Sequence, residues 1–215
     1  NGIVTLIFGI ATMFRDIIFE TTGFFPLEFI FGPNMSGKTT LAKNALHLFI
    51  NSNQMANLGS SSLAGITRLM AMLSNVPILI NEYFDTIGLQ KIDIIKGLFE
   101  GTGRIMSTED NDSFTQFTAN CTLILTGQDL PDYDPAMFSR SLLVEQYEAV
   151  FDGQAITRLE ELKKYHNKGL TTITLSLLRH REDFMAEWQE SWKRTVERFN
   201  DDADLTGLPQ RVIEC

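Results

Sequence analysis

The sequence predicts an α/β fold: a three-layer sandwich with a mainly parallel sheet, followed by a helical C-terminal part. Apolar runs at residues 27–31, 76–80, 121–126 and 141–145 have the length and composition of short buried strands. Segments with helical spacing separate these runs, and this alternation is typical of a parallel sheet with helices on both faces. From about residue 154 onward the chain is charged and helical in pattern.

The start of the chain is predicted to be a packed N-terminal helix over residues 1–22. Residues 2–11 are apolar, but they are too short to cross a membrane and no basic residue precedes them. No membrane partner is therefore expected. The chain begins without Met and ends without a helix-stop or tail composition, so both ends have the pattern of cuts through a longer polypeptide.

The strand at 27–31 leads into a phosphate-binding loop, because residues 32–39 match the pattern G-x-x-x-x-G-K-[ST]. Glycines let the backbone wrap closely around a polyphosphate, and the following helix presents its positive end to it. Lys38 supplies a mobile cation for the β- and γ-phosphates, and Thr39 a hydroxyl for Mg²⁺. A chance match in a loop is the alternative. The predicted ATP-binding residues are Gly32, Pro33, Asn34, Met35, Ser36, Gly37, Lys38, Thr39 and Thr40.

The strand at 76–80 ends in Asn81 and Glu82, where hydrolysis of a nucleotide needs a metal-holding group and a residue that orients water. Asn81 stands where Asp is expected, so it can hydrogen-bond a metal-bound water but lacks the charge that strengthens Mg²⁺ binding. Glu82 keeps a carboxylate suited to polarising water. The alternative is a strand that simply ends in polar residues. Between the loop and this strand, residues 51–62 are predicted to be a loop whose serines cap the next helix.

A helix is predicted over residues 90–99, followed by a Gly-rich turn and a β-hairpin or long loop at 104–118. The third strand then ends at Gln128, whose amide can reach the γ-phosphate or the attacking water from the side opposite Glu82. Gln128 is therefore the candidate sensor.

Arg140 ends a short predicted helix just before the fourth strand. An arginine at this place can project into a neighbouring subunit's nucleotide and neutralise transition-state charge. A surface or salt-bridged arginine is the alternative.

The C-terminal part carries an apolar stripe at helical spacing, which we interpret as packing within that part. We expect a nucleotide-binding core over residues 1–150 and a helical extension or lid over 151–215. The stripe consists of Phe184, Met185, Trp188 and Trp192.

Composition and charge exclude some partners. The chain has 215 residues, 44% of them hydrophobic, enough for a substantial core. With 18 basic and 27 acidic residues its net charge is −9, so no bulk positive field attracts nucleic acid or anionic membrane. Any DNA contact must therefore be local or supplied by a larger assembly.

The two cysteines, Cys121 and Cys215, are expected to be reduced thiols, as is usual in a cytosolic protein, so the chain is expected to be cytoplasmic. The histidines are scattered and lack zinc-site spacing.

The order of these motifs resembles the AAA+ class of P-loop ATPases. The resemblance rests on GPNMSGKTT, ILINE, LILTGQ and PAMFSR. It implies a homo-oligomeric ring, usually a hexamer, with ATP and Mg²⁺ between neighbouring subunits and with Arg140 acting in trans.

More narrowly, the chain resembles the superfamily 3 helicase domain of phage, plasmid and integrative-element primase-helicases. That resemblance rests on SSLAGITRLMAMLSNVPILINEY, FEGTGR and LILTGQDLP followed by FSR, and it covers roughly residues 14–147. It implies DNA as a partner, and a primase segment in the same longer chain.

In such rings a hairpin between the acidic strand and the sensor strand grips single-stranded DNA, and residues 104–118 hold that position. Arg104 is the only basic residue there, whereas Glu109, Asp110 and Asp112 would repel phosphate. Phe114 and Phe117 suit base stacking and core packing equally.

Three functions follow from these patterns. The leading one is an ATP-dependent motor that unwinds or translocates DNA. The second is a slow or inactive nucleotide-gated module that recruits a replication partner, favoured by Asn81 and the acidic hairpin. The third is a small-substrate kinase, which needs an Arg-rich lid; Arg179, Arg181 and Arg194 are candidates that no pattern ties to the site.

Overall fold

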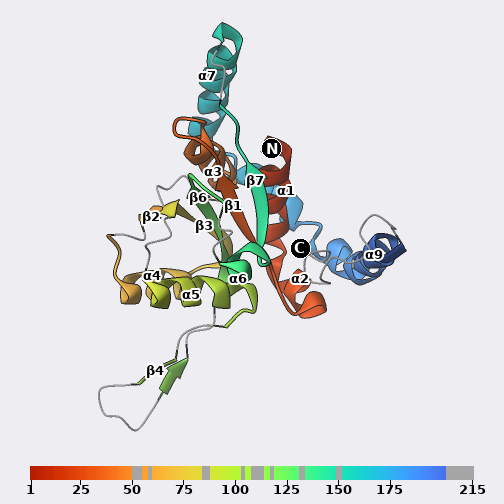
Figure 1. Ribbon diagram of the computed structural model, residues 1–215. Coiled ribbons are helices and arrows are strands. Elements are labelled where there is room, and N and C mark those ends of the chain that lie inside the picture. The colour runs from red at the N-terminus through yellow and green to blue at the C-terminus, as the bar shows by residue number, and fades with distance from the viewer. Residues whose placement is uncertain are drawn as a thin grey trace.

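A five-stranded parallel sheet with helices on both faces forms the centre of the molecule (Figure 1). The computed structural model describes residues 1–49, 55–57, 60–83, 88–102, 105–107, 114–116, 119–130, 134–148 and 152–201. The strands lie in the order β2, β3, β6, β1, β7, and each neighbouring pair is parallel. The predicted α/β fold with a mainly parallel sheet is therefore confirmed. The strand bounds are β1 Leu27–Phe31, β2 Met55–Asn57, β3 Ser74–Tyr83, β6 Asn120–Gly127 and β7 Ser141–Glu145.

Four strands were predicted, and the fifth, β2, lies within the segment 51–62 that was expected to be a loop. The loop prediction was wrong for β2. A strand at the edge of a sheet needs only one partner strand, so even three residues can form it. β2 pairs with β3 alone, and its Asn57 is in register with Asn81. The predicted serine cap is present, since Ser62 Oγ accepts a hydrogen bond of 3.1 Å from Gly65 N at the start of α4.

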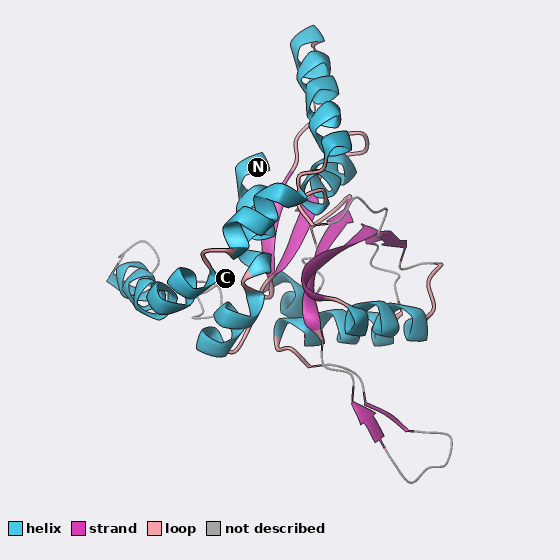
Figure 2. Ribbon diagram, turned by 180° about the vertical axis from the view of Figure 1, so that it is seen from behind, coloured by secondary structure: helices cyan, strands magenta, loops and turns pink. Residues whose placement is uncertain are grey.

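Two pairs of helices cover the two faces of the sheet (Figures 1 and 2). Side chains along β6 alternate between these faces, so Leu123 and Leu125 pack with one pair and Ile124 with the other. α4 Leu63–Met72 and α5 Leu89–Phe99 share the core of Leu123, and α1 Gly2–Met13 and α3 Lys38–Leu46 share that of Ile124. The sheet is thus the middle of three layers.

The N-terminal segment, predicted as one helix over residues 1–22, forms two helices. α1 ends at Met13, α2 runs from Arg15–Thr22, and the two are bent by 83°. Phe14 at the junction has φ −113° and ψ 19°, outside the helical range, and its buried ring stacks on Phe184. Among the described residues no single helix is long and apolar enough to cross a membrane; only α1 and α2 together, across their bend, satisfy those criteria.

The helical C-terminal part consists of α7 Gly153–Lys168, α8 Thr171–Leu178 and α9 Arg181–Asp201. The apolar stripe of α9 was predicted to pack within this part, and its rings do stack on one another, Phe184 on Trp188 and Trp188 on Trp192. The stripe also packs outside this part: the ring centroid of Phe184 lies 4.4 Å from that of Phe14 and that of Trp192 lies 6.3 Å from that of Phe24, so α9 packs against the N-terminal segment as well. Arg181 adds an ion pair with Asp16 of α2. α9 therefore joins the two ends of the described chain.

The segment between α5 and β6 contains a two-stranded antiparallel sheet, β4 Ile105–Ser107 and β5 Phe114–Gln116. Residues 105–107 and 114–116 therefore pair as expected for the hairpin, one of the two alternatives for residues 104–118, and the rest of that range lies outside the described residues. Figures 1 and 2 show it projecting away from the main sheet beyond α5, while α7 projects in the opposite direction.

Candidate nucleotide site

The phosphate loop connects the carboxyl end of β1 to the start of α3, as its motif requires. Gly32 has φ 144°, and a Cβ there would lie 2.0 Å from the carbonyl oxygen of Gln146. The two segments approach this closely because the pairing of β1 with β7 continues past the end of β7, where Gln146 N donates a hydrogen bond of 2.7 Å to Phe31 O. Gly37 has φ 89° and is the N-cap of α3. Glycine is therefore required by close approach at residue 32 and by backbone conformation at residue 37.

Lys38 turns its ammonium group into the loop. Nζ donates to Gly32 O at 2.8 Å and to Pro33 O at 2.6 Å, and it lies 3.5 Å from Ser36 Oγ. Burial lowers the pKa of Lys38 from its ordinary value. Gly37 has no side chain to cap the first turn of α3, so the helix presents its N–H groups and positive end to an anion seated beside Lys38.

Asn81 joins the loop helix to two strands. Its Oδ1 accepts hydrogen bonds of 2.8 Å from Thr39 Oγ1 on α3 and of 2.8 Å from Thr126 Oγ1 on β6. Mg²⁺ prefers oxygen ligands, and here Thr39 and Asn81 bring two oxygen atoms together at one point. Both side chains are neutral. The donor set therefore fits a hard cation whose charge is balanced mainly by the phosphates it accompanies.

Glu82 follows directly, at a β-bulge in β3. The β3–β6 register runs from Ile80 opposite Leu125 to Tyr83 opposite Gly127, so β3 carries one extra residue there. Glu82 has φ 60°, which is uncommon outside glycine. Its side chain is exposed, and Oε2 accepts a hydrogen bond of 3.2 Å from Asn57 Nδ2.

The sequence reasoning missed Asn57. Its only signal in the sequence is an amide at the end of a three-residue strand, and that signal can be recognised only once β2 is known to exist.

Gln128 lies at the end of β6, beside the loop. Its carbonyl oxygen accepts a hydrogen bond of 3.1 Å from Gly32 N, and its side chain is exposed. A cavity of about 170 Å³ brings together seven of the predicted residues, namely Asn34, Met35, Lys38, Thr39, Asn81, Glu82 and Gln128. The loop residues Gly32, Pro33, Ser36, Gly37 and Thr40 lie outside its lining, and Thr40 is exposed on α3. The cavity is lined by Asn34, Met35, Lys38, Thr39, Asn81, Glu82, Tyr83, Thr126, Gly127 and Gln128.

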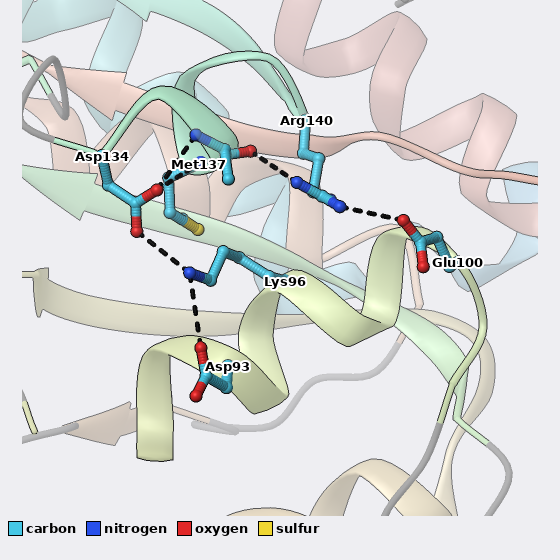
Figure 3. A network of polar contacts seen from close by, with 7 residues as sticks. Asp93, Lys96, Glu100, Asp134, Met137 and Arg140 are labelled. Atoms are coloured by element: carbon cyan, nitrogen blue, oxygen red, sulfur yellow. Dashed lines mark hydrogen bonds and ion pairs between the residues drawn. The ribbon is translucent and has the colours of Figure 1, made fainter. Parts of the chain in front are cut away.

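Arg140 lies at the amino ends of the strands, opposite the carboxyl ends where the phosphate loop lies; we call these the amino edge and the carboxyl edge of the sheet. It follows α6 Pro135–Phe138, and its carbonyl oxygen accepts a hydrogen bond of 3.0 Å from Leu27 N at the start of β1. Its guanidinium pairs with Glu100, Nη2 to Oε1 at 2.9 Å (Figure 3). It cannot reach this chain's own loop from the opposite edge, so the predicted role in trans stays a prediction. Arg104, predicted to contact nucleic acid, lies outside the described residues.

Among the described residues, Cys121, His47 and His166 lie outside the lining of this cavity. Burial raises the pKa of the Cys121 thiol to about 11, which keeps it protonated. His47 and His166 stack on each other with ring centroids 3.8 Å apart, tying the end of α3 to α7. Cys215 lies outside the described residues.

Comparisons with known proteins give a match at the level of structure. No family model matches the chain, and no curated protein does. Among solved structures, the chain is similar to one described as SCCmec type IV Cch, an active helicase, with a TM-score of 0.64 and 18% identity. The chain has a helicase-like fold. The match covers 98% of this chain and 40% of that one, so the chain spans less than half the length of its structural neighbour.

Proposed function

We propose that this chain binds Mg·ATP at the carboxyl edge of the sheet and hydrolyses it. The observation that carries the proposal is the cavity where the loop residues Lys38 and Thr39 meet Asn81, Glu82 and Gln128 from the ends of two neighbouring strands. A phosphate loop alone indicates only nucleotide binding. A carboxylate and an amide facing the same cavity add the groups that hydrolysis needs.

Each residue has a role in this scheme. The loop N–H groups and Lys38 bind the β- and γ-phosphates and offset their charge. Thr39, together with Asn81 directly or through water, would hold Mg²⁺, which would polarise the phosphate oxygens. Glu82, held by Asn57, orients a water for in-line attack on the γ-phosphorus and accepts its proton as the bond to ADP breaks. Gln128 contacts the γ-phosphate or the water from the other strand.

We further propose that hydrolysis drives DNA unwinding or translocation in phage or mobile-element replication. The likeness to an active helicase and the projecting β4–β5 hairpin support this. In this arrangement copies of the chain form a ring, such as a hexamer. Arg140 of each copy faces the neighbouring nucleotide, and the hairpin, with Arg104, meets DNA. A primase segment belongs elsewhere in the same longer chain.

Steady-state ATPase rates with and without single-stranded DNA test the proposal. Lys38→Ala and Glu82→Gln are each expected to lower turnover about 100-fold or more, because one removes phosphate charge compensation and the other the base. Glu82→Gln should still bind ATP, whereas Lys38→Ala should not. Lys163→Ala and Glu160→Gln are matched controls, since these residues form an exposed ion pair on α7. Turnover that survives both site variants would refute hydrolysis here.

A second function is favoured by Asn81. Its amide oxygen already accepts two hydroxyl hydrogen bonds and carries no charge, so a metal at this point is bound less strongly than by a carboxylate. The chain would then be a slow or inactive nucleotide-gated module that recruits a replication partner. Strong stimulation of ATP turnover by single-stranded DNA in the unmodified protein would exclude this alternative.

A further inference from the structure

A network of ion pairs joins α5 to the segment 134–140 at the amino edge of the sheet (Figure 3). Lys96 Nζ lies 3.2 Å from Asp134 Oδ2 and 3.4 Å from Asp93 Oδ1. One turn further along the chain, at the C-cap of α5, Glu100 pairs with Arg140 at 2.9 Å. α5 is therefore tied to both ends of the short segment that carries Arg140.

The two ties differ in what they hold. Asp134 caps α6, its Oδ1 accepting from Ala136 N at 3.0 Å and Met137 N at 3.2 Å, while its other oxygen meets Lys96. These hydrogen bonds and the Lys96 charge hold the pKa of Asp134 below its ordinary value, although burial opposes them. This tie fixes the position of the helix. The Glu100 tie fixes only the far end of one long side chain.

Arg140 is engaged within its own chain. Nη1 donates to Ala136 O at 3.2 Å, and the guanidinium lies over the Phe99 ring, 5.7 Å from its centroid. The side chain is only 16% exposed, and Nε has no hydrogen-bond partner among the described residues. Glu100 is 46% exposed, so water reaches the carboxylate side of the pair. Arg140 must be released from Glu100 before its terminal nitrogens can serve another anion.

We infer that Glu100 is a positioning residue that holds Arg140 in its own chain until a neighbour's nucleotide competes for it. The inference rests on the proposed function, in which Arg140 acts on the adjacent nucleotide. A half-exposed carboxylate contributes little to stability through such a pair and is readily displaced. A terminal phosphate carries more charge and, at a subunit interface, meets Arg140 away from water. The Lys96–Asp134 tie keeps α6 in place while the exchange occurs.

The test is Glu100→Gln, measured as the protein concentration that gives half-maximal ATPase turnover. Without the competing carboxylate, Arg140 is available at lower cost, so this concentration should fall roughly two- to fivefold, the range that exposed ion pairs allow. Maximal turnover per subunit should stay unchanged. Asp93→Asn is the matched control, because it removes a charge from the same helix without touching Arg140.

Two more variants decide the interpretation. Adding Arg140→Ala to Glu100→Gln should abolish the gain, whereas Lys96→Met should lower the melting temperature without producing it. An unchanged half-maximal concentration would show that the pair is only structural, and a fall in maximal turnover equal to that of Arg140→Ala would show that Glu100 orients Arg140 rather than competes for it. Either result overturns the inference. Absence of turnover in the unmodified protein would instead refute the proposed function, and the inference with it.

Discussion

The two edges of the parallel sheet hold their charged side chains in opposite ways. At the carboxyl edge, the polar contacts observed for Lys38 are two backbone carbonyls and a hydroxyl, and Glu82 meets the amide of Asn57. At the amino edge, Lys96 and Arg140 are each paired with carboxylates. Charged side chains are thus held by neutral groups at the carboxyl edge and by oppositely charged groups at the amino edge.

This difference bears on which ligands each edge accepts. An anion entering the carboxyl edge displaces only neutral groups from Lys38, so it gains the full attraction of the ammonium. An anion approaching Arg140 must first displace Glu100. The carboxyl edge is therefore open to a ligand in a single chain, whereas the amino edge needs a competing charge.

Gly32→Ala should break the carboxyl edge and have the largest effect. Its Cβ would meet the Gln146 carbonyl oxygen at 2.0 Å, and its φ of 144° is strained for any L side chain. Overpacking and backbone strain together should cost about 4 kcal/mol of stability, and nucleotide binding should be lost. Thermal unfolding and binding of a fluorescent ATP analogue measure both effects.

The matched control for this substitution is Gly153→Ala at the first position of α7, where an added Cβ has no neighbouring atom within 4 Å. An unchanged melting temperature in Gly32→Ala would contradict the close approach of the two chain segments.

Glu28→Gln tests the middle of the sheet, between the two edges. Burial raises the pKa of Glu28 from 4.5 to about 7, the nearby Thr5 hydroxyl opposing it, and neither carboxylate oxygen has a hydrogen-bond partner among the described residues. The folded state therefore binds more protons than the unfolded state between these values, so this contribution to stability is full below pH 4.5 and lost as the pH rises through 7. At pH 8 the variant should be more stable by about 3 kcal/mol, and at pH 4 nearly unchanged.

Denaturant unfolding at a series of pH values measures this difference, with the exposed Glu160→Gln as control. The pKa values of His47 and His166 are lowered by burial, so their contributions change with pH in the opposite direction. The difference between variant and unmodified protein isolates Glu28. Equal destabilisation at pH 4 and pH 8 would contradict a charged, unpaired Glu28 at the higher pH.

Asn81→Asp should have the smallest effect and sharpens the role of the metal position. The added charge beside Thr39 should raise the apparent Mg²⁺ affinity of the nucleotide complex about tenfold, or about 1.4 kcal/mol. Mg²⁺ titration of nucleotide binding measures this. Asn167→Asp, an exposed change on α7 that makes the same difference in net charge, is the control. Equal Mg²⁺ dependence in the two variants would show that Asn81 is not part of the metal site.

The central sheet was largely predictable from the sequence. The strands at 27–31 and 141–145 were predicted with the bounds observed, since buried parallel strands are continuous apolar runs between turn residues. β3 and β6 extend further than predicted because residues at their ends still pair with neighbouring strands: Asn81 with Asn57 of β2, Ser74 with Asn120, and Tyr83 with Gly127. The bend at Phe14 was not predictable, because helical periodicity does not show where an aromatic side chain turns toward a partner such as Phe184.

The candidate site was partly predictable. The loop and the polar strand ends follow from local patterns, and the sheet order brings them to one cavity. The contacts of Asn57 with Glu82 and of Glu100 with Arg140 join residues 25 and 40 positions apart. No local rule links such pairs, because each depends on which strand or helix becomes a neighbour in space.

The extra residue in β3 has a consequence for what this strand can present. In a regularly pleated strand, adjacent side chains point to opposite faces, so Asn81 and Glu82 would serve different layers of the molecule. The bulge breaks this alternation after Ile80, and the successive residues Asn81, Glu82 and Tyr83 all line the same cavity. Deleting either Asn81 or Glu82 would restore the alternation, but the cavity would then lose the amide or the carboxylate. The chemistry of the site thus depends on a count of residues as much as on their identity.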